Sequence, residues 1–144
     1  MSKTLAATKK LEAPEGWSDE LKAEFAEEQF SGCVGGKLLA ESDWARVWEV
    51  RLKPGERKGF HRHVLDYFWT STTDCKGKSH YPDGRVDYPV YKAGDTSFLK
   101  FAEGEFMVHD MENIGETDFV FITVEFLNSA NAPIPLPDSV RNKA

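Results

Sequence analysis

Short runs rich in aromatic and β-branched residues, several of them alternating with polar residues, follow one another through most of the chain after residue 36. This pattern is typical of β-strands that have one buried face. The runs that predict strands are 37–42, 43–52, 66–73, 78–81, 86–91, 97–101, 105–110 and 119–127. Turn sequences such as Pro54-Gly55 and Gly94-Asp95 separate them. Because no helical pattern lies between the strands, the sequence predicts an all-β sandwich or barrel.

The two ends of the chain have a different pattern. Residues 1–16 are polar and predict a loosely held arm. A short helix is predicted from Ser18, because Ser18 can cap it and Leu21 with Phe25 forms an apolar i, i+4 pair. Prolines at 133, 135 and 137 exclude a regular internal strand from the tail. We therefore predict an N-terminal arm with a short helix at 1–35, a β-barrel at 36–127 and a C-terminal tail at 128–144.

Size and charge narrow the classes of function. A chain of 144 residues fits one domain, and no apolar run approaches the roughly 20 residues that span a bilayer. The first residues lack the apolar segment of a secretory signal, so we expect a cytoplasmic protein. A net charge of −6 argues against nucleic acid as a partner. Arg57 and Lys58 belong to a local basic cluster that we expect on a solvated strand face.

The two cysteines allow one disulfide at most, and a chain of this length does not need one. We expect Cys33 and Cys75 to be reduced. Cys75 lies beside a predicted turn, where a catalytic thiol is an alternative to a small packed residue.

Three of the four histidines carry the predicted chemistry. His61 and His63 are two residues apart, so on a strand both imidazoles project from the same face. His109 is predicted on a second strand, and in a β-barrel one face of every strand looks inward. Three neutral imidazoles can bind a divalent metal and leave positions open for water or substrate. The fourth histidine, His80, is predicted in an exposed hairpin, and Arg62 is predicted to point outward.

The spacing of these histidines resembles a known family. Gly55-x5-His61-x-His63 is similar to the first half of cupin motif 1, and Gly94-Asp95 followed by His109-x3-Asn113 is similar to cupin motif 2. The resemblance covers about residues 36–127. It implies a double-stranded β-helix, or jelly-roll, barrel with one metal at its centre, here bound by His61, His63 and His109. It also implies a homodimer.

The sequence departs from the family pattern after His63. The expected glutamate is missing, and Tyr67 and Phe68 stand where it would be. Asp66 comes one residue too early, so it is either a fourth ligand or base, or an ordinary residue at the start of a strand. Tyr67 shares the alternation of the histidine pair and carries a hydroxyl, which makes it a candidate proton donor or substrate contact. Asp66 and Tyr67 are therefore the candidate catalytic residues.

The predicted function is that of a metal-dependent cupin. The ion is manganese or iron in the first place, with nickel or zinc as further choices. The ligand is a small metabolite whose carboxylate or carbonyl oxygens chelate the ion, and the reaction is a dioxygenation or a Lewis-acid isomerisation, lyase or decarboxylation reaction. The alternative is a cupin that binds a metal or small molecule without catalysis.

Overall fold

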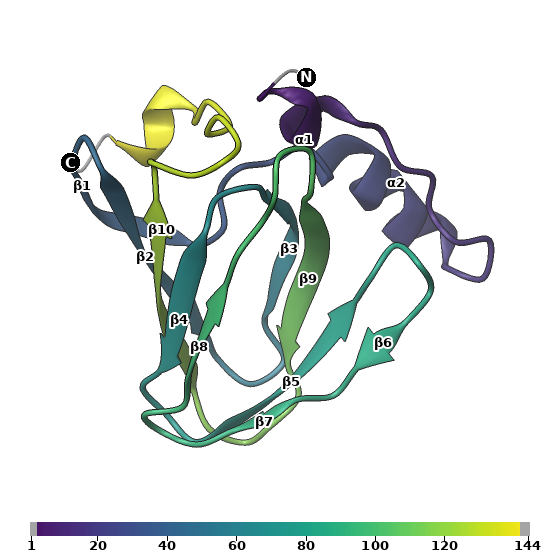
Figure 1. Cartoon of the computed structure of the whole chain (residues 1–144). Coiled ribbons are helices and arrows are strands. Elements are labelled where there is room, and N and C mark those ends of the chain that lie inside the picture. Colours follow the sequence, from purple (N-terminus) through teal and green to yellow (C-terminus); the bar gives the residue numbers. More distant parts are fainter. Residues whose placement is uncertain (1–2, 142–144) are drawn as a thin grey trace.

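A computed structural model describes residues 3–141 of the chain. Strands dominate it, with helices only near the ends (Figure 1). The elements are α1 (Leu5–Thr8), α2 (Asp19–Glu28), β1 (Lys37–Glu41), β2 (Ala45–Leu52), β3 (Arg57–His63), β4 (Tyr67–Ser71), β5 (Cys75–His80), β6 (Val86–Asp87), β7 (Val90–Tyr91), β8 (Thr96–Leu99), β9 (Met107–Asn113), β10 (Phe119–Phe126) and a 3-10 turn at Asp138–Val140.

The strands form two antiparallel sheets that face each other across the core (Figure 1). One sheet has the order β1-β2-β10-β4-β8, and the other has the order β3-β9-β5-β6 with β7 also paired to β5. Neighbours such as β2 and β10 are far apart in the sequence, which is the crossed connectivity of a jelly roll. The prediction of an all-β jelly roll with a short N-terminal helix is confirmed.

Apolar side chains from both sheets pack together in the space between them. Val50, Leu52, Phe119 and Phe121 come from the first sheet, and buried Cys75 comes from the second. The rings of Phe119 and Phe121 are stacked with centroids 4.5 Å apart. Burial of such rings supplies most of the driving force that holds the two sheets together.

The helix α2 covers the outer face of the second sheet. Ser18 accepts a hydrogen bond from the N–H of Leu21, as predicted for its cap. Phe25 of α2 is almost fully buried against Phe60 of β3 and Val108 of β9. The helix therefore fixes the outer side of the two strands whose inner side carries the predicted histidines.

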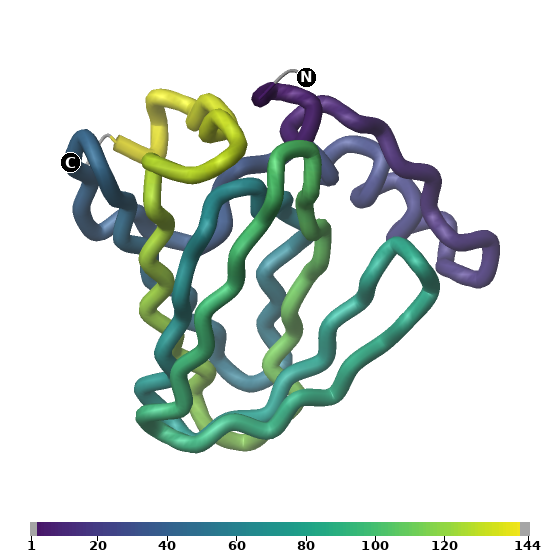
Figure 2. The backbone as a smooth tube through the Cα atoms, in the orientation of Figure 1, coloured from purple at the N-terminus to yellow at the C-terminus, as the bar shows by residue number. Residues whose placement is uncertain are grey.

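The N-terminal segment is not a loosely held arm, which corrects the prediction for residues 3–16. Figure 2 shows it running along the outside of α2 and the second sheet. Arg62 points out of the barrel, as predicted, but this segment buries it to 1% exposure. Its guanidinium donates to the carbonyl oxygens of Ala6, Lys9 and Gln29. The bonds to Ala6 and Lys9 tie the segment to β3, and the local sequence pattern does not predict them.

Asn113 of the second motif has a structural role. Its side chain is fully buried, donates to the carbonyl oxygens of Leu52 and Thr117 and accepts from the N–H of Gly115. It therefore joins the ends of β2, β9 and the following turn. Within residues 3–141, no helix is long and apolar enough to cross a membrane.

Candidate metal centre

The structure brings the three predicted histidines together. His61 and His63 lie on the inner face of β3, and His109 lies directly opposite His61 on β9. His61 and His63 are each 3% exposed, and one ring nitrogen of each of the three histidines lies within 4.8 Å of the others. His63 Nε2 is 3.2 Å from His109 Nε2. Two nitrogen ligands with bonds of about 2.1 Å to one ion, at angles of about 90 to 110°, are about 3.0 to 3.4 Å apart, so this pair has the separation that a metal requires.

Hydrogen bonds set the tautomers of two of the rings. His61 Nδ1 lies 2.9 Å from the Gly59 carbonyl oxygen, which can only accept, so Nδ1 carries the hydrogen. His109 Nδ1 lies 3.3 Å from Ser79 Oγ. The Ser79 hydroxyl donates its only hydrogen to the Asp110 carbonyl oxygen, so it accepts from His109 Nδ1. Both rings thus present an Nε2 lone pair, as metal ligands do.

His63 has a different environment. Its Nδ1 is buried and is without a hydrogen-bond partner among the described residues. Its ring stacks on Tyr67, with centroids 4.3 Å apart. Packing on Tyr67 therefore positions this imidazole, and its Nε2 is the nitrogen that faces His109 and is free to bind an ion.

Burial keeps the three imidazoles neutral. Desolvation lowers the pKa of His109 to about 4 and holds the pKa values of His61 and His63 well below their usual range. The neighbouring Lys58 ammonium lowers the pKa values of His61 and His63 further. Neutral imidazole is the form that binds metals, so the donor set is ready at neutral pH. The residues present fit a divalent transition metal.

A cavity of about 70 Å³ adjoins the histidines between the two sheets. Most of its wall is apolar or aromatic, and its lining residues are Val34, Val50, Lys58, His61, His63, Tyr67, Trp69, Tyr91, His109, Met111, Phe119, Phe121 and Thr123. Tyr67 is among them, on the inner face as its alternation predicts. Burial raises the pKa of its hydroxyl well above the usual value of 10, so this group is a proton donor rather than a base.

The structure does not bring Asp66 to the histidines. Its carboxylate accepts a hydrogen bond from the N–H of Phe101 at 2.9 Å, and its own N–H donates to Ser129. It lies outside both the histidine cluster and the cavity lining among the described residues. This position suits the alternative that Asp66 is a residue of the strand start.

Lys58 lines the cavity beside the histidines, so the prediction that it lies on a solvated strand face is wrong. The pairing of β3 with β9 is irregular between Lys58 and His61, where an extra residue forms a bulge. The bulge puts Lys58 on the same face as His61 although the two are three residues apart. Burial lowers the pKa of Lys58, and the negative charge of Glu28 partly opposes this effect. The glycine at position 59 is the one sequence sign of such an irregularity.

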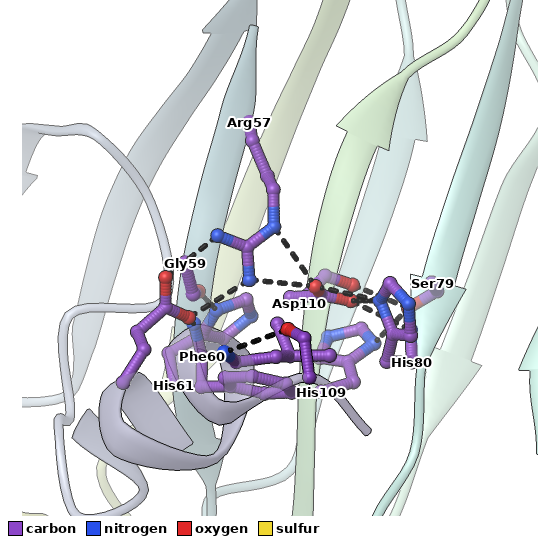
Figure 3. Close-up of polar contacts among 11 residues, drawn as sticks. Arg57, Gly59, Phe60, His61, Ser79, His80, His109 and Asp110 are labelled. Carbon is purple, nitrogen blue, oxygen red and sulfur yellow. Dashed lines mark hydrogen bonds and ion pairs between the residues drawn. The ribbon is translucent and has the colours of Figure 1, made fainter. Parts of the chain in front are cut away.

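A network of charged groups surrounds Asp110, the residue that follows His109 on β9 (Figure 3). Asp110 is fully buried and accepts from Arg57 Nη2 at 2.8 Å and from the N–H of His80 at 2.6 Å. Arg57 also donates to both carboxylate oxygens of Glu24 on α2, at 2.6 and 2.8 Å. These partners raise the pKa of Arg57 and lower that of Glu24.

His80 is part of this network, which corrects its expected exposure. Its side chain is 15% exposed, and Nδ1 lies 2.9 Å from Asp110 Oδ2. Arg57, expected on a solvated face, is likewise a structural residue. The pairing of β5 with β9 creates these contacts, and periodicity along one strand does not reveal them.

Comparisons with known proteins agree with this architecture. No family model matches the sequence, and no curated protein matches it. Among solved structures, a cupin domain from Bordetella pertussis is 26% identical, with a TM-score of 0.55 over 62% of this chain and 88% of that one. An RmlC-like cupin family protein with a double-stranded β-helix fold from Methanocaldococcus jannaschii is 17% identical, with a TM-score of 0.50 over 69% of this chain and 79% of that one.

Proposed function

This chain is a member of the cupin superfamily, and on that basis we propose that it is a metal-dependent enzyme acting on a small metabolite that chelates the ion through oxygen. The observation that carries the proposal is the meeting of His61, His63 and His109 beside a mostly apolar cavity. Such a site presents neutral nitrogen donors in apolar surroundings, which strengthen polarisation of a bound ligand.

The metal proposed is one divalent ion, manganese or iron in the first place and nickel or zinc otherwise. When bound, it supplies Lewis-acid polarisation or, as iron, dioxygen chemistry, so the reaction class is dioxygenase or isomerase, lyase or decarboxylase. His61, His63 and His109 hold it, and hydrogen bonds from the first and third rings to Gly59 and Ser79 fix their orientation.

Of the two candidate catalytic residues, Tyr67 is the one we retain. Its ring lies against His63, and its hydroxyl remains protonated because it is buried. It can therefore donate a proton or hydrogen bond to an oxygen of the ligand. Asp66 has no part in this proposal, because its carboxylate is engaged with the backbone at Phe101.

A second candidate is a cupin that binds a metal or small molecule without turning it over. One observation favours it: none of the described residues that line the cavity is an aspartate or glutamate that could act as a general base. The two functions differ in turnover and not in binding.

The proposed assembly is a cytoplasmic homodimer. The strand β8 is an edge of its sheet, and its Phe98 is 76% exposed. By register, Val47, Val124, Phe68 and Phe98 form an apolar row across the outer face of that sheet, which suits burial against a second copy. Light scattering is expected to report a dimer for wild type and a monomer for Phe98→Ser. A monomeric wild type would refute the proposed dimer.

The function is tested by turnover. Protein loaded separately with Mn²⁺ and Fe²⁺ is offered a panel of small hydroxy, oxo and dicarboxylic acids, with oxygen uptake and product formation followed. The enzyme proposal expects conversion of at least one compound, loss of conversion in His109→Ala, and a large decrease in Tyr67→Phe with the metal retained. Ligand-dependent thermal stabilisation without conversion of any compound would favour the non-catalytic function.

A further inference from the structure

We infer that Lys58 selects small carboxylates for this site, its ammonium pairing with a carboxylate held between it and the three histidines. The inference rests on the proposed function, whose substrate class it narrows. Without a cation in its wall, the cavity would bind neutral chelators as well as it binds carboxylates.

The position of Lys58 is built into the strand. It is paired with Met111 across the β3–β9 ladder, and Met111 lines the same cavity. The bulge between Lys58 and His61 gives the lysine the inward direction of the histidines. Without the extra residue, the regular alternation would turn Lys58 to the opposite face of the sheet.

The negative charge of Glu28 acts on Lys58 without forming an ion pair with it. Among residues 3–141, no carboxylate forms an ion pair with it, whereas nearby Arg57 has two acidic partners. Within the described lining of the cavity it is the only lysine or arginine, and no acidic residue is present. A partly buried ammonium without a counterion is costly, and a bound anion would remove that cost.

The size of the cavity sets the size of the anion. A volume of about 70 Å³ holds on the order of five water-sized probes. The ligand is therefore a carboxylate of about five non-hydrogen atoms. The aromatic walls leave few polar contacts for longer polar substituents.

Lys58 also lies at the boundary between the cavity and solvent. It lines a surface hollow of about 330 Å³ beside α2, together with Glu24, Glu28 and Ser31. Lys58 is therefore a residue that the hollow and the histidine cavity share.

The test compares pyruvate with pyruvamide, which has the same shape but no charge. Isothermal titration measures the binding of each to Mn²⁺-loaded wild type, Lys58→Met and Lys53→Met, and elemental analysis measures the metal in each sample. Methionine retains most of the apolar stem of lysine. Lys53→Met makes the same change of net charge at an exposed position five residues away.

Wild type and Lys53→Met are expected to bind pyruvate at least about tenfold more tightly than pyruvamide, and Lys58→Met is expected to lose that preference. All three are expected to hold one metal ion per chain. Equal pyruvate affinity in Lys58→Met and wild type, or no preference in metal-loaded wild type, would overturn the role of Lys58 and leave the metal site standing. Wild type that holds no metal would instead overturn the proposed function.

Discussion

Asp110 is the residue whose removal we expect to destabilise the fold most clearly. It follows His109 on β9, and its fully buried carboxylate accepts from Arg57 Nε, Arg57 Nη2 and the N–H of His80 at 2.6 to 3.0 Å. In Asp110→Ala these donors lose a fully buried acceptor, although the Arg57 side chain is 28% exposed and keeps some contact with water. The guanidinium keeps its two bonds to Glu24, so it does not become a wholly unpaired cation.

The expected loss in the free energy of unfolding depends on which ion pairs of Arg57 remain in the variant. Breaking a buried ion pair by removing one partner costs about 3 to 5 kcal/mol. Because Glu24 still neutralises Arg57, we expect the lower end, about 3 kcal/mol. Against a total stability of about 5 to 15 kcal/mol for a domain, this is a large fraction, and it lowers the melting temperature by roughly 10 °C.

Urea unfolding followed by tryptophan fluorescence measures this loss, since Trp48 is fully buried. The matched control is Asp87→Ala, which removes an exposed carboxylate 3.8 Å from Arg85 and is expected to cost less than about 1 kcal/mol. A loss below 1 kcal/mol in Asp110→Ala, or equal losses in the two variants, would refute the reasoning that the buried network holds β9 in place.

Three further predictions concern the site and its titration. Ser79→Ala removes the acceptor for His109 Nδ1 and is expected to weaken Mn²⁺ binding about 10- to 100-fold in a competitive chelator titration, with the fold unchanged by circular dichroism. For the metal-free protein, the pKa of His109 is about 4 when folded and about 6.5 when unfolded, so the unfolded chain binds more protons between these values. The stability that this histidine contributes is complete above pH 6.5 and is lost as the pH falls towards 4, by at most about 3 kcal/mol in urea unfolding. The same dependence on pH in wild type and in His109→Leu would contradict this. Glu125 has the opposite sign, because burial raises its pKa to about 7 despite the hydrogen bond from Trp48. The stability that Glu125 contributes therefore falls as the pH rises from 4.5 to 7, and Glu125→Gln is expected to be more stable than wild type at pH 8, by at most about 3 kcal/mol, and no more stable at pH 4.

The strands and the three histidines were predictable because both depend on period-two geometry. His61 and His63 share a face whatever the rest of the chain does, and a jelly roll turns one face of each strand inward. The apolar pair Leu21 and Phe25 likewise placed α2 and its buried side. These features are encoded locally, over two to four residues.

The features that were not predicted from the sequence depend on long-range contacts or on irregularities in a strand, and no local periodicity encodes these. One extra residue in β3 moved Lys58 from the outer face to the cavity, where it changes the charge of the site. Arg62 anchors the N-terminal segment through carbonyl groups of Ala6 and Lys9, so a polar stretch became part of the packed structure. The contact between His80 and Asp110 required the pairing of β5 with β9.

The most direct test of the central claim is the metal content of the protein purified without added metal and then dialysed against Mn²⁺ or Fe²⁺, measured by elemental analysis beside its His61→Ala and His109→Ala variants. The account predicts one ion per wild-type chain and less than about a tenth of that in each variant, with His80→Ala unchanged because His80 lies outside the cluster. Wild type without bound metal, or metal that persists in both His61→Ala and His109→Ala, would contradict it.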